Sequence, residues 1–598
     1  MTTQMSYAGM MEALHTGSAA LDYRRTGRLL REMEAQAQVR IALMGNVTLD
    51  LVTPFLRVEA ARVGQMAAFH VSPFGQYMQD LHSDAFQAFD PSVSALILSA
   101  EAMRPDAFER FHQLSVEDRQ KLRDDMLAEI EGWIDLALAR SSATVLIANF
   151  PMPQSALGVA DLSSDYGEHE FFLDLNLALM RTVRARPRAM MLDLAEAVAR
   201  VGTRQAFDRR MHFLAGLGWT DALMREFAAL FGHALVGALG AARKCLVLDL
   251  DNSLWGGVVG EDGPHGIRVG RGDMVSEAYR AFQLRVRALK ERGVILALCS
   301  KNNVQDVEEV FRLRADMPLQ WSDMAATAIS WAPKYQGLEA IAAQLNIGLD
   351  ALVFMDDNAA EIAAVRHYCP DVHAVLLPAD PSDFVTLLDD LPWFEKSRLT
   401  AEDRAKSQHY ALAAKRSALC ASCDPMDYLR DLEMRAVIRD AGPADLLRVH
   451  QLFNKTNQFN LMTRRPSIGE VEAMMTGDGW HLMLAELRDR FGDMGIVALC
   501  GLRRDGAVLR IEHFLMSCRA MGRGLEHALM NHVKRRFLKA QGCDLLEGRY
   551  LPTAKNGPVR GFFADQGFAA SDGDGGGDYQ LARSAVGFKD CDWIKLEA

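Results

Sequence analysis

Several features that would mark an exported, membrane or nucleic-acid-binding protein are missing from the sequence. No apolar run reaches the roughly 18 residues that a transmembrane helix needs. The start, MTTQMSYAGMMEALHTG, lacks a basic segment followed by an apolar stretch, so we expect no export and a cytoplasmic location. The formal charge of −12, without a dense Lys/Arg block, argues against non-specific binding to nucleic acid.

Cysteines are few and scattered. The nine in the chain are odd in number, which is typical of reduced cytosolic thiols rather than a disulfide framework. Cys420 and Cys423 form a CxxC pair, but no second pair follows at the spacing of a zinc ribbon. We interpret the pair as packed thiols at a helix end.

The chain is long enough for several domains. At 598 residues it exceeds a single core, and a hydrophobic content of 49% is that of a folded protein. Short apolar runs alternate with amphipathic segments in two regions, which predicts two parallel-sheet α/β domains followed by an α+β region. The predicted division is 1–35, a helical extension; 36–235 and 240–400, the α/β domains; 401–424, a helical linker; and 425–598, the α+β domain.

A central strand that ends in acids is the most informative stretch. Residues 245–248 are a continuous apolar run, as expected of a strand buried on both faces. Asp249 and Asp251 follow at its carboxyl end, with Ser253 two residues further on. In an open parallel sheet, ligands bind outside this end of the strands.

Three other segments of the same domain bring reactive side chains to strand ends. They are LALCSKNN with Ser300, SWAPKYQG with Lys334, and LVFMDDN with Asp356 and Asp357. A cluster of carboxylates repels itself unless a cation neutralises it, and oxygen ligands favour Mg²⁺. We therefore expect a magnesium site, with these ligands: Asp249, Asp251, Asp356 and Asp357.

The chemistry that fits this set is phosphoryl transfer. Asp249 is expected to attack phosphorus and form an aspartyl-phosphate. Asp251 is expected to protonate the leaving oxygen and later to deprotonate water. A lysine and short hydroxyl donors suit a phosphate, and the predicted phosphate ligands are Ser253, Ser300 and Lys334.

The order of these motifs resembles the haloacid dehalogenase (HAD) superfamily, and within it the FkbH-like phosphatases of polyketide assembly. The resemblance rests on LDLDNSLWGGVVGEDG, LALCSKNN, WAPKYQGL and LVFMDDNAAE, and it covers nearly all of the chain beyond about residue 40. The chain departs from the pattern in three places: Ser253 replaces the usual threonine, Tyr335 follows the lysine, and Pro and Arg are missing near Asn358. These departures affect the expected substrate contacts more than the chemistry.

The resemblance implies a bifunctional enzyme. Such proteins are thought to load the phosphoglyceryl group of 1,3-bisphosphoglycerate, or a similar acyl phosphate, onto an enzyme thiol. They then remove the phosphate and pass the glyceryl group to the phosphopantetheine arm of an acyl carrier protein. Two thiols are candidates, Cys299 and Cys518. Because strand neighbours face opposite sides, Cys299 should point away from the site if Ser300 points toward it.

The last domain resembles the GCN5-related acetyltransferases (GNAT). Near Cys518, the sequence SCRAMGRGLEHALM predicts a strand, a glycine-rich turn and a helix. Backbone N–H groups at such a helix start can bind pyrophosphate. The resemblance implies a pantetheine-binding loop, with these residues: Arg519, Gly522, Arg523 and Gly524.

The front domain resembles SGNH hydrolases, with GNVTLD where those enzymes carry their nucleophile block. Gly-Asp-Ser is absent, so Thr48 is a weak nucleophile candidate, with His212 after Asp208 as a base. A structural role or binding of the carrier protein is the preferred interpretation. Two alternatives for the whole chain stay open: a simple magnesium-dependent phosphatase, and an acyltransferase in which Glu512 would be the general base.

Overall fold

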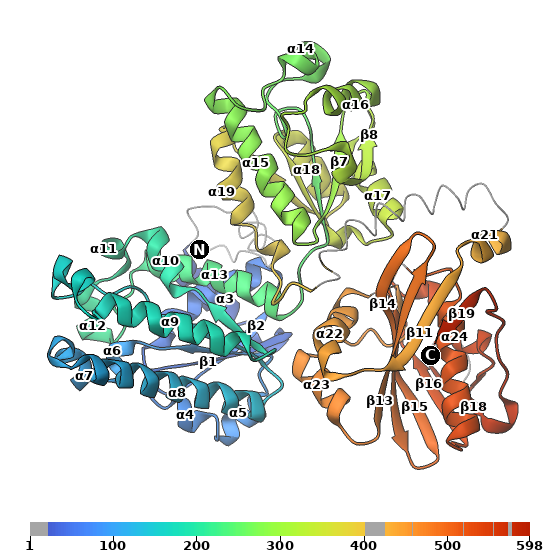
Figure 1. Cartoon of the computed structure of the whole chain (residues 1–598), viewed down its shortest axis with the longest axis horizontal. Helices are drawn as coiled ribbons and strands as arrows, with labels where there is room; N and C mark the ends of the chain where they lie inside the picture. The colour runs from blue at the N-terminus through green and yellow to red at the C-terminus, as the bar shows by residue number, and fades with distance from the viewer. Residues whose placement is uncertain are drawn as a thin grey trace, which may run out of the picture. The chain divides into compact units, whose positions relative to one another are not determined.

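The structure is a computed structural model that describes residues 22–400, 403, 425–456, 458–517, 520–553, 555–571 and 577–597. Three sheets organise these residues (Figure 1), and the chain divides into two compact units near residue 241. This confirms a multi-domain chain with parallel-sheet α/β domains. Each sheet lies inside one of the predicted ranges, whose bounds stay predictions. Cys420, Cys423 and most of the predicted linker lie outside the described residues.

The first unit contains a five-stranded sheet in the order β2-β1-β3-β4-β5, with every pair of neighbours parallel. The strands are β1 (Val39–Gly45), β2 (Ala67–Val71), β3 (Val93–Ile97), β4 (Thr144–Ala148) and β5 (Ala189–Leu192). The central strands β3 and β4 are buried along their whole length, as the apolar runs predict.

Helices surround this sheet (Figure 1). They are α2 (Tyr23–Arg31), α3 (Thr53–Arg62), α4 (Tyr77–Asp80), α5 (Asp84–Phe89), α6 (Ala100–Met103), α7 (Pro105–Glu109), α8 (Val116–Arg140), α9 (Glu168–Arg184), α10 (Leu194–Val201), α11 (Thr203–Ala206), α12 (Arg209–Ala215) and α13 (Asp221–Ala238). The fully buried Trp133 of α8 packs in one core with Phe171 of α9.

A second parallel sheet of five strands follows in the order β10-β9-β6-β7-β8. Its strands are β6 (Cys245–Leu248), β7 (Ile295–Ser300), β8 (Met324–Ile329), β9 (Leu352–Asp356) and β10 (His373–Leu376). The chain builds outward from β6 through β7 to β8, then returns to the other side of β6 with β9. The direction of growth therefore reverses beside β6, and a crevice at the carboxyl ends is the expected ligand position.

The helices of this part are α14 (Val259–Gly266), α15 (Met274–Glu291), α16 (Val304–Leu313), α17 (Lys334–Leu345), α18 (Ala359–Tyr368) and α19 (Phe384–Asp389). Alternate residues of β6 and β7 share one buried cluster with Leu338 of α17 and Val365 of α18. Cys299 belongs to that cluster, which fixes the direction of its side chain.

The third sheet is mixed and runs in the order β17-β18-β16-β15-β14-β13-β11-β19, with β12 beside β15. Its strands are β11 (Met434–Asp440), β12 (Phe459–Asn460), β13 (Trp480–Asp489), β14 (Gly492–Asp505), β15 (Val508–Met516), β16 (Leu545–Tyr550), β17 (Ala569–Ala570), β18 (Gly577–Ala582) and β19 (Ile594–Glu597). Among the strand pairs that the structure describes in this sheet, β15–β16 and β11–β19 are parallel and the others are antiparallel. The region is α+β, as expected.

The α-helices beside this sheet are α21 (Pro425–Asp431), α22 (Leu446–Lys455), α23 (Ile468–Thr476), α24 (Leu525–Val533) and α25 (Phe562–Asp565). A π-helix over Lys534–Ala540 continues α24. Among the helices that the structure describes, none is both long and apolar enough to cross a membrane.

Candidate active site

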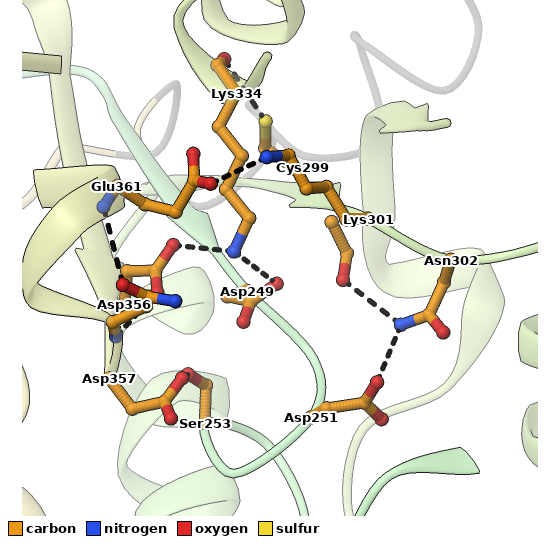
Figure 2. A network of polar contacts seen from close by, with 12 residues as sticks. Asp249, Asp251, Ser253, Cys299, Lys301, Asn302, Lys334, Asp356, Asp357 and Glu361 are labelled. Atoms are coloured by element: carbon orange, nitrogen blue, oxygen red, sulfur yellow. Dashed lines mark hydrogen bonds and ion pairs between the residues drawn. The ribbon is translucent and has the colours of Figure 1, made fainter. Parts of the chain in front are cut away.

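Acidic and basic side chains from separate segments meet at the carboxyl end of the middle sheet (Figure 2). Lys334, the first residue of α17, reaches between two neighbouring strands. Its Nζ lies 3.0 Å from Oδ1 of Asp249, after β6, and 2.6 Å from Oδ2 of Asp356, at the end of β9. All three side chains are almost fully buried, so this is a charged cluster inside the protein.

Burial dominates the electrostatics of Asp249. Loss of water raises the pKa of this carboxyl to about 6, because the Lys334 charge lowers it only partly and Asp356 raises it further. For Lys334, burial lowers the pKa, but the charges of Asp249 and Asp356 outweigh that effect and raise it. The lysine therefore stays charged, and the two acids retain a negative charge in excess.

The acids fit a divalent cation. Oxygen atoms of Asp249, Asp356 and Asp357 all lie within 4.8 Å of one another. Oδ1 of Asp249 is buried and accepts no hydrogen bond of good geometry, its close partner being the Lys334 ammonium. Burial and the neighbouring Asp356 also raise the pKa of Asp357. Uncompensated oxygen ligands at this spacing suit Mg²⁺.

Asp251 lies beside this group of three acids. Its carboxylate is not one of the three, and its role as a metal ligand stays a prediction. Oδ1 accepts hydrogen bonds from Trp255 Nε1 at 2.8 Å and from the Val259 N–H at 3.0 Å. Oδ2 accepts from Asn302 Nδ2 at 2.9 Å. The three donors hold the carboxylate at the cavity wall, where an acid–base group is needed.

The two predicted serines have different surroundings. Ser300 Oγ accepts a hydrogen bond from Asn302 Nδ2 at 3.2 Å, and the residue lines the cavity. Ser253 is fully buried, and its hydroxyl donates to Asp357 Oδ1 at 3.3 Å. Ser253 therefore helps to orient Asp357, and its contact with a phosphate stays a prediction.

The cavity beside these groups has a volume of about 200 Å³. It is lined by Asp249, Asp251, Asn252, Ser300, Lys301, Lys334, Asp357, Asn358 and Glu361. Lys301 and Glu361 form an ion pair of 2.6 Å within this lining (Figure 2). A polar cavity of this size accommodates a phosphoryl group and a hydrated cation, but not the whole of a large substrate.

The sequence analysis missed four of the lining residues or their partners: Asn252, Asn302, Asn358 and Glu361. Lys301 and Asn302 directly follow Ser300, and Asn358 directly follows the paired aspartates, so the run of polar residues past each strand was a usable signal. Glu361 lies on α18, one turn beyond the strand end, and no sequence pattern marks it.

Cys299 does not meet the needs of a thiol nucleophile in this structure. Its side chain is buried in the core that α17 and α18 cover, and Sγ donates to the Lys334 carbonyl oxygen at 3.4 Å. Burial raises the pKa of the thiol to about 12, more than the nearby Lys334 lowers it. The alternation of strand residues predicted this orientation, and it weighs against an acyl group on Cys299.

The predicted pantetheine loop is described in part, because Cys518 and Arg519 lie outside the described residues. Gly522 and Gly524 have positive φ angles of 74° and 82°, and Gly524 precedes α24. The Arg523 side chain is buried, with Nη1 3.1 Å from Oδ2 of the fully buried Asp489. This ion pair holds the guanidinium against the core, and its contact with pantetheine stays a prediction.

The weaker candidates of the sequence analysis are Thr48 with His212 in the front domain and Glu512 in the last domain. Thr48 Oγ1 donates to the Ala215 carbonyl oxygen at 2.5 Å, which occupies the hydroxyl proton of the nucleophile candidate in the front domain. His212 stacks edge-on against Phe213. Glu512 is half-buried on β15, at a register shift opposite Gly501 and Leu502. Among the described residues, Thr48 does not donate to a carboxylate or imidazole, and Glu512 accepts no hydrogen bond from a nucleophile.

Comparison with solved structures shows a likeness to a phosphatase domain. The structure is similar to the N-terminal part of protein BF1531 from Bacteroides fragilis, described as containing a phosphatase domain complexed with Mg, with 27% sequence identity and a TM-score of 0.57. The match covers 63% of this chain and 99% of the other. It agrees with the HAD-type prediction for the middle domain. No family model and no curated protein matches the sequence.

Acetyltransferases give a much smaller likeness. The ribosomal-protein-S18-alanine N-acetyltransferase from Escherichia coli is 15% identical, covers 25% of this chain and 96% of its own, and has a TM-score of 0.20. The spermidine N-acetyltransferase SpeG from Vibrio cholerae is 12% identical, with 25% and 94% covered and a TM-score of 0.20. A likeness of this size carries no argument about the C-terminal region.

Proposed function

We propose that this chain is a magnesium-dependent phosphatase of the HAD type. The observation that carries the proposal is the convergence of Asp249, Lys334, Ser300 and Asp357 on one cavity at the carboxyl edge of the middle sheet. The likeness to a phosphatase domain described with bound Mg supports it. Asp249, Asp356 and Asp357 would hold the ion, which when bound neutralises phosphate oxygens and the acids around them.

The residues divide the reaction between them. The Asp249 carboxylate attacks phosphorus, and the bond to the leaving oxygen breaks as an aspartyl-phosphate forms. Asp251 gives a proton to the leaving oxygen and then takes one from the water that hydrolyses the intermediate. Lys334 and Ser300 hold the phosphoryl oxygens.

The finer proposal is a glyceryl transferase as well as a phosphatase. In this scheme an enzyme thiol attacks the acyl phosphate of 1,3-bisphosphoglycerate, the C1 phosphate leaves as inorganic phosphate, and a phosphoglyceryl thioester forms on the enzyme. The enzyme then removes the remaining phosphate and passes the glyceryl group to the phosphopantetheine arm of an acyl carrier protein. The support is the sequence resemblance to FkbH-like proteins. With Cys299 buried, Cys518 is the preferred thiol, beside the glycines of the GNAT-like loop.

A simple phosphatase is the second candidate. The burial of Cys299 and the core position of Arg523 favour it, because both remove groups that the transfer reaction was expected to use. An acyltransferase centred on Glu512 has less support, since no nucleophile or base partner accompanies that residue among the described residues.

Intact-protein mass spectrometry distinguishes these proposals. The full chain is mixed with 1,3-bisphosphoglycerate, Mg²⁺ and a holo acyl carrier protein. A glyceryl adduct on the enzyme and then on the carrier is expected for the transferase. Phosphate release without any adduct would leave only the phosphatase, and no phosphate release would contradict both. Cys518→Ala should abolish the adduct, whereas Cys299→Ala, the matched control, should retain it.

A further inference from the structure

One helix of the first unit is apolar on two faces. The inner face of α9 is buried in the core of this unit. The outer face carries three apolar residues that are 60%, 45% and 46% exposed: Leu173, Leu177 and Met180. Their spacing of four and three residues places them in a single stripe along the helix. The neighbouring helix α8 exposes no large apolar side chain over its whole length, so the stripe is particular to α9 (Figure 1).

Charged residues extend this stripe at both ends. The exposed Glu170 lies three residues before Leu173, and the exposed Arg184 lies four residues after Met180. Arg181, also exposed, adds a second positive charge at the later end. An acid near the start and arginines near the end suit the helix dipole, but the dipole does not account for the apolar residues between them.

The stripe is symmetric about Leu177. Glu170 and Arg184 each lie seven residues from it, which is close to two helical turns in opposite directions. When such a helix packs antiparallel against a second copy of itself, the two-fold axis passes near Leu177. Glu170 then faces the partner's Arg184, and Leu173 lies near the partner's Met180. The stripe is therefore complementary to itself in both charge and polarity.

A second apolar segment adjoins the start of the stripe. It is the 3₁₀-helix η4 (Gly158–Ser163), in which Val159 and Leu162 are 85% and 70% exposed. Asp161 Oδ1 accepts a hydrogen bond from the Glu168 N–H at 2.8 Å, which ties η4 to the first turn of α9. A stable dimer buries about 800 Å² on each partner, more than three side chains supply, and η4 enlarges the apolar surface on either side of the axis.

We propose that the outer face of α9 is the centre of a two-fold interface between two copies of this chain, which pack their α9 helices antiparallel. A second copy is the occupant that the charges favour, because equal spacing of acid and base about Leu177 is a condition for self-pairing, whereas another partner would not require it. The inference is independent of the proposed phosphatase, since every residue it uses belongs to the first unit.

Sedimentation equilibrium of the full chain over roughly 1–100 µM tests the assembly, because this range covers moderate dimer affinities. We expect dimers, and we expect Leu177→Asp to raise the dimer Kd by about 100-fold or more, since it replaces apolar contacts with like charges at the axis. Leu313→Asp is the matched control: Leu313, at the end of α16, is 42% exposed, and its substitution should leave the Kd unchanged. A monomer over the whole range, or dimers that Leu177→Asp leaves intact, would overturn the proposal.

Charge exchange tests the register. Glu170→Arg and Arg184→Glu should each weaken the homodimer by roughly a few-fold, because like charges then face each other on both sides of the axis. A mixture of the two variants should restore the affinity of the unmodified chain, since every pair across the interface again joins an acid to a base. Equal affinities for the homodimers and the mixed dimer would contradict the antiparallel register.

Cysteine cross-linking locates the axis. Leu177→Cys should form an intermolecular disulfide under mild oxidation, since its two copies face each other, and the unmodified chain gives the background. Two copies of Leu173→Cys are about 12 Å apart along the helices and should not cross-link, whereas Leu173→Cys mixed with Met180→Cys should. A Leu173→Cys product as abundant as that of Leu177→Cys would place the axis elsewhere and overturn the proposal. Phosphate hydrolysis by the same variants is measured in parallel, which distinguishes a failed dimer from a failed phosphatase.

Discussion

The two five-stranded parallel sheets both carry polar side chains where their strands end. In the first unit these side chains bind one another's strands: Asn46, after β1, exchanges two hydrogen bonds of 3.0 and 2.8 Å with the backbone of Ser99, after β3. Asn149, after β4, donates from Nδ2 to Asp193 Oδ1, after β5, at 2.7 Å and accepts from the Ala195 N–H at 2.9 Å. In the middle sheet, by contrast, Asp249 and its neighbours face a cavity with charge in excess.

The difference shows what distinguishes a ligand-binding site from a strand end whose polar groups are hydrogen-bonded within the protein. A polar residue past a parallel strand is equally compatible with both, because the backbone groups there need partners. In the first unit, the neutral amides of Asn46 and Asn149 bind backbone N–H and C=O groups without adding charge. Buried acids in the middle sheet cannot neutralise one another. The negative charge that remains can bind a cation, and the cation in turn can bind a phosphate.

The largest effect should come from removing the nucleophile of the middle sheet. We expect Asp249→Asn to lower phosphate hydrolysis by roughly 10³-fold or more, because an amide cannot form the aspartyl-phosphate. Phosphate release measures the rate, and denaturant unfolding checks that the variant is folded. Hydrolysis at an undiminished rate would show that Asp249 is not the nucleophile. The middle sheet would then have no more claim to a catalytic edge than the first.

A pH effect of intermediate size should mark the same sheet. Burial raises the pKa of Asp249 from 3.8 to about 6, so below that pH the carboxyl is increasingly protonated and a metal must displace the proton. Mg²⁺ affinity, followed by calorimetry, should therefore fall by up to about tenfold per pH unit below pH 6. An affinity independent of pH in this range would mean that Asp249 does not bind the ion.

The smallest effect should come from the first unit. Asn46→Ala leaves the Ser99 backbone without two partners, which should cost about 1–3 kcal/mol in the free energy of unfolding. Phosphate hydrolysis should stay within about twofold, since this residue ties strands together. A loss of hydrolysis as large as that in Asp249→Asn would show that the two sheets are not functionally separate.

Much of this arrangement follows from the sequence alone. Alternating apolar runs predict the two parallel sheets, and the topology of such sheets brings Asp249, Ser300 and Asp356 to one edge. The strand period also foretells that Cys299 faces away from Ser300. These inferences succeed because they depend on backbone geometry, which short patterns specify.

The rest depends on partners that are distant in the sequence. Arg523 is paired with Asp489, 34 residues away, and no pattern distinguishes such a buried arginine from one that binds a ligand. Ser253 donates to Asp357, more than a hundred residues later. Glu361 reaches the cavity from inside a helix. Side-chain pairing of this kind is decided by tertiary packing.

Lys334 has a consequence for how the domain assembles. Its ammonium lies between acids that follow β6 and end β9, two strands which pair directly although about a hundred residues separate them. Before α17 docks, these acids oppose the pairing of their own strands at that end. With the helix docked, the ammonium offsets that repulsion, so the same lysine that faces the cavity also supports the pairing of β6 with β9.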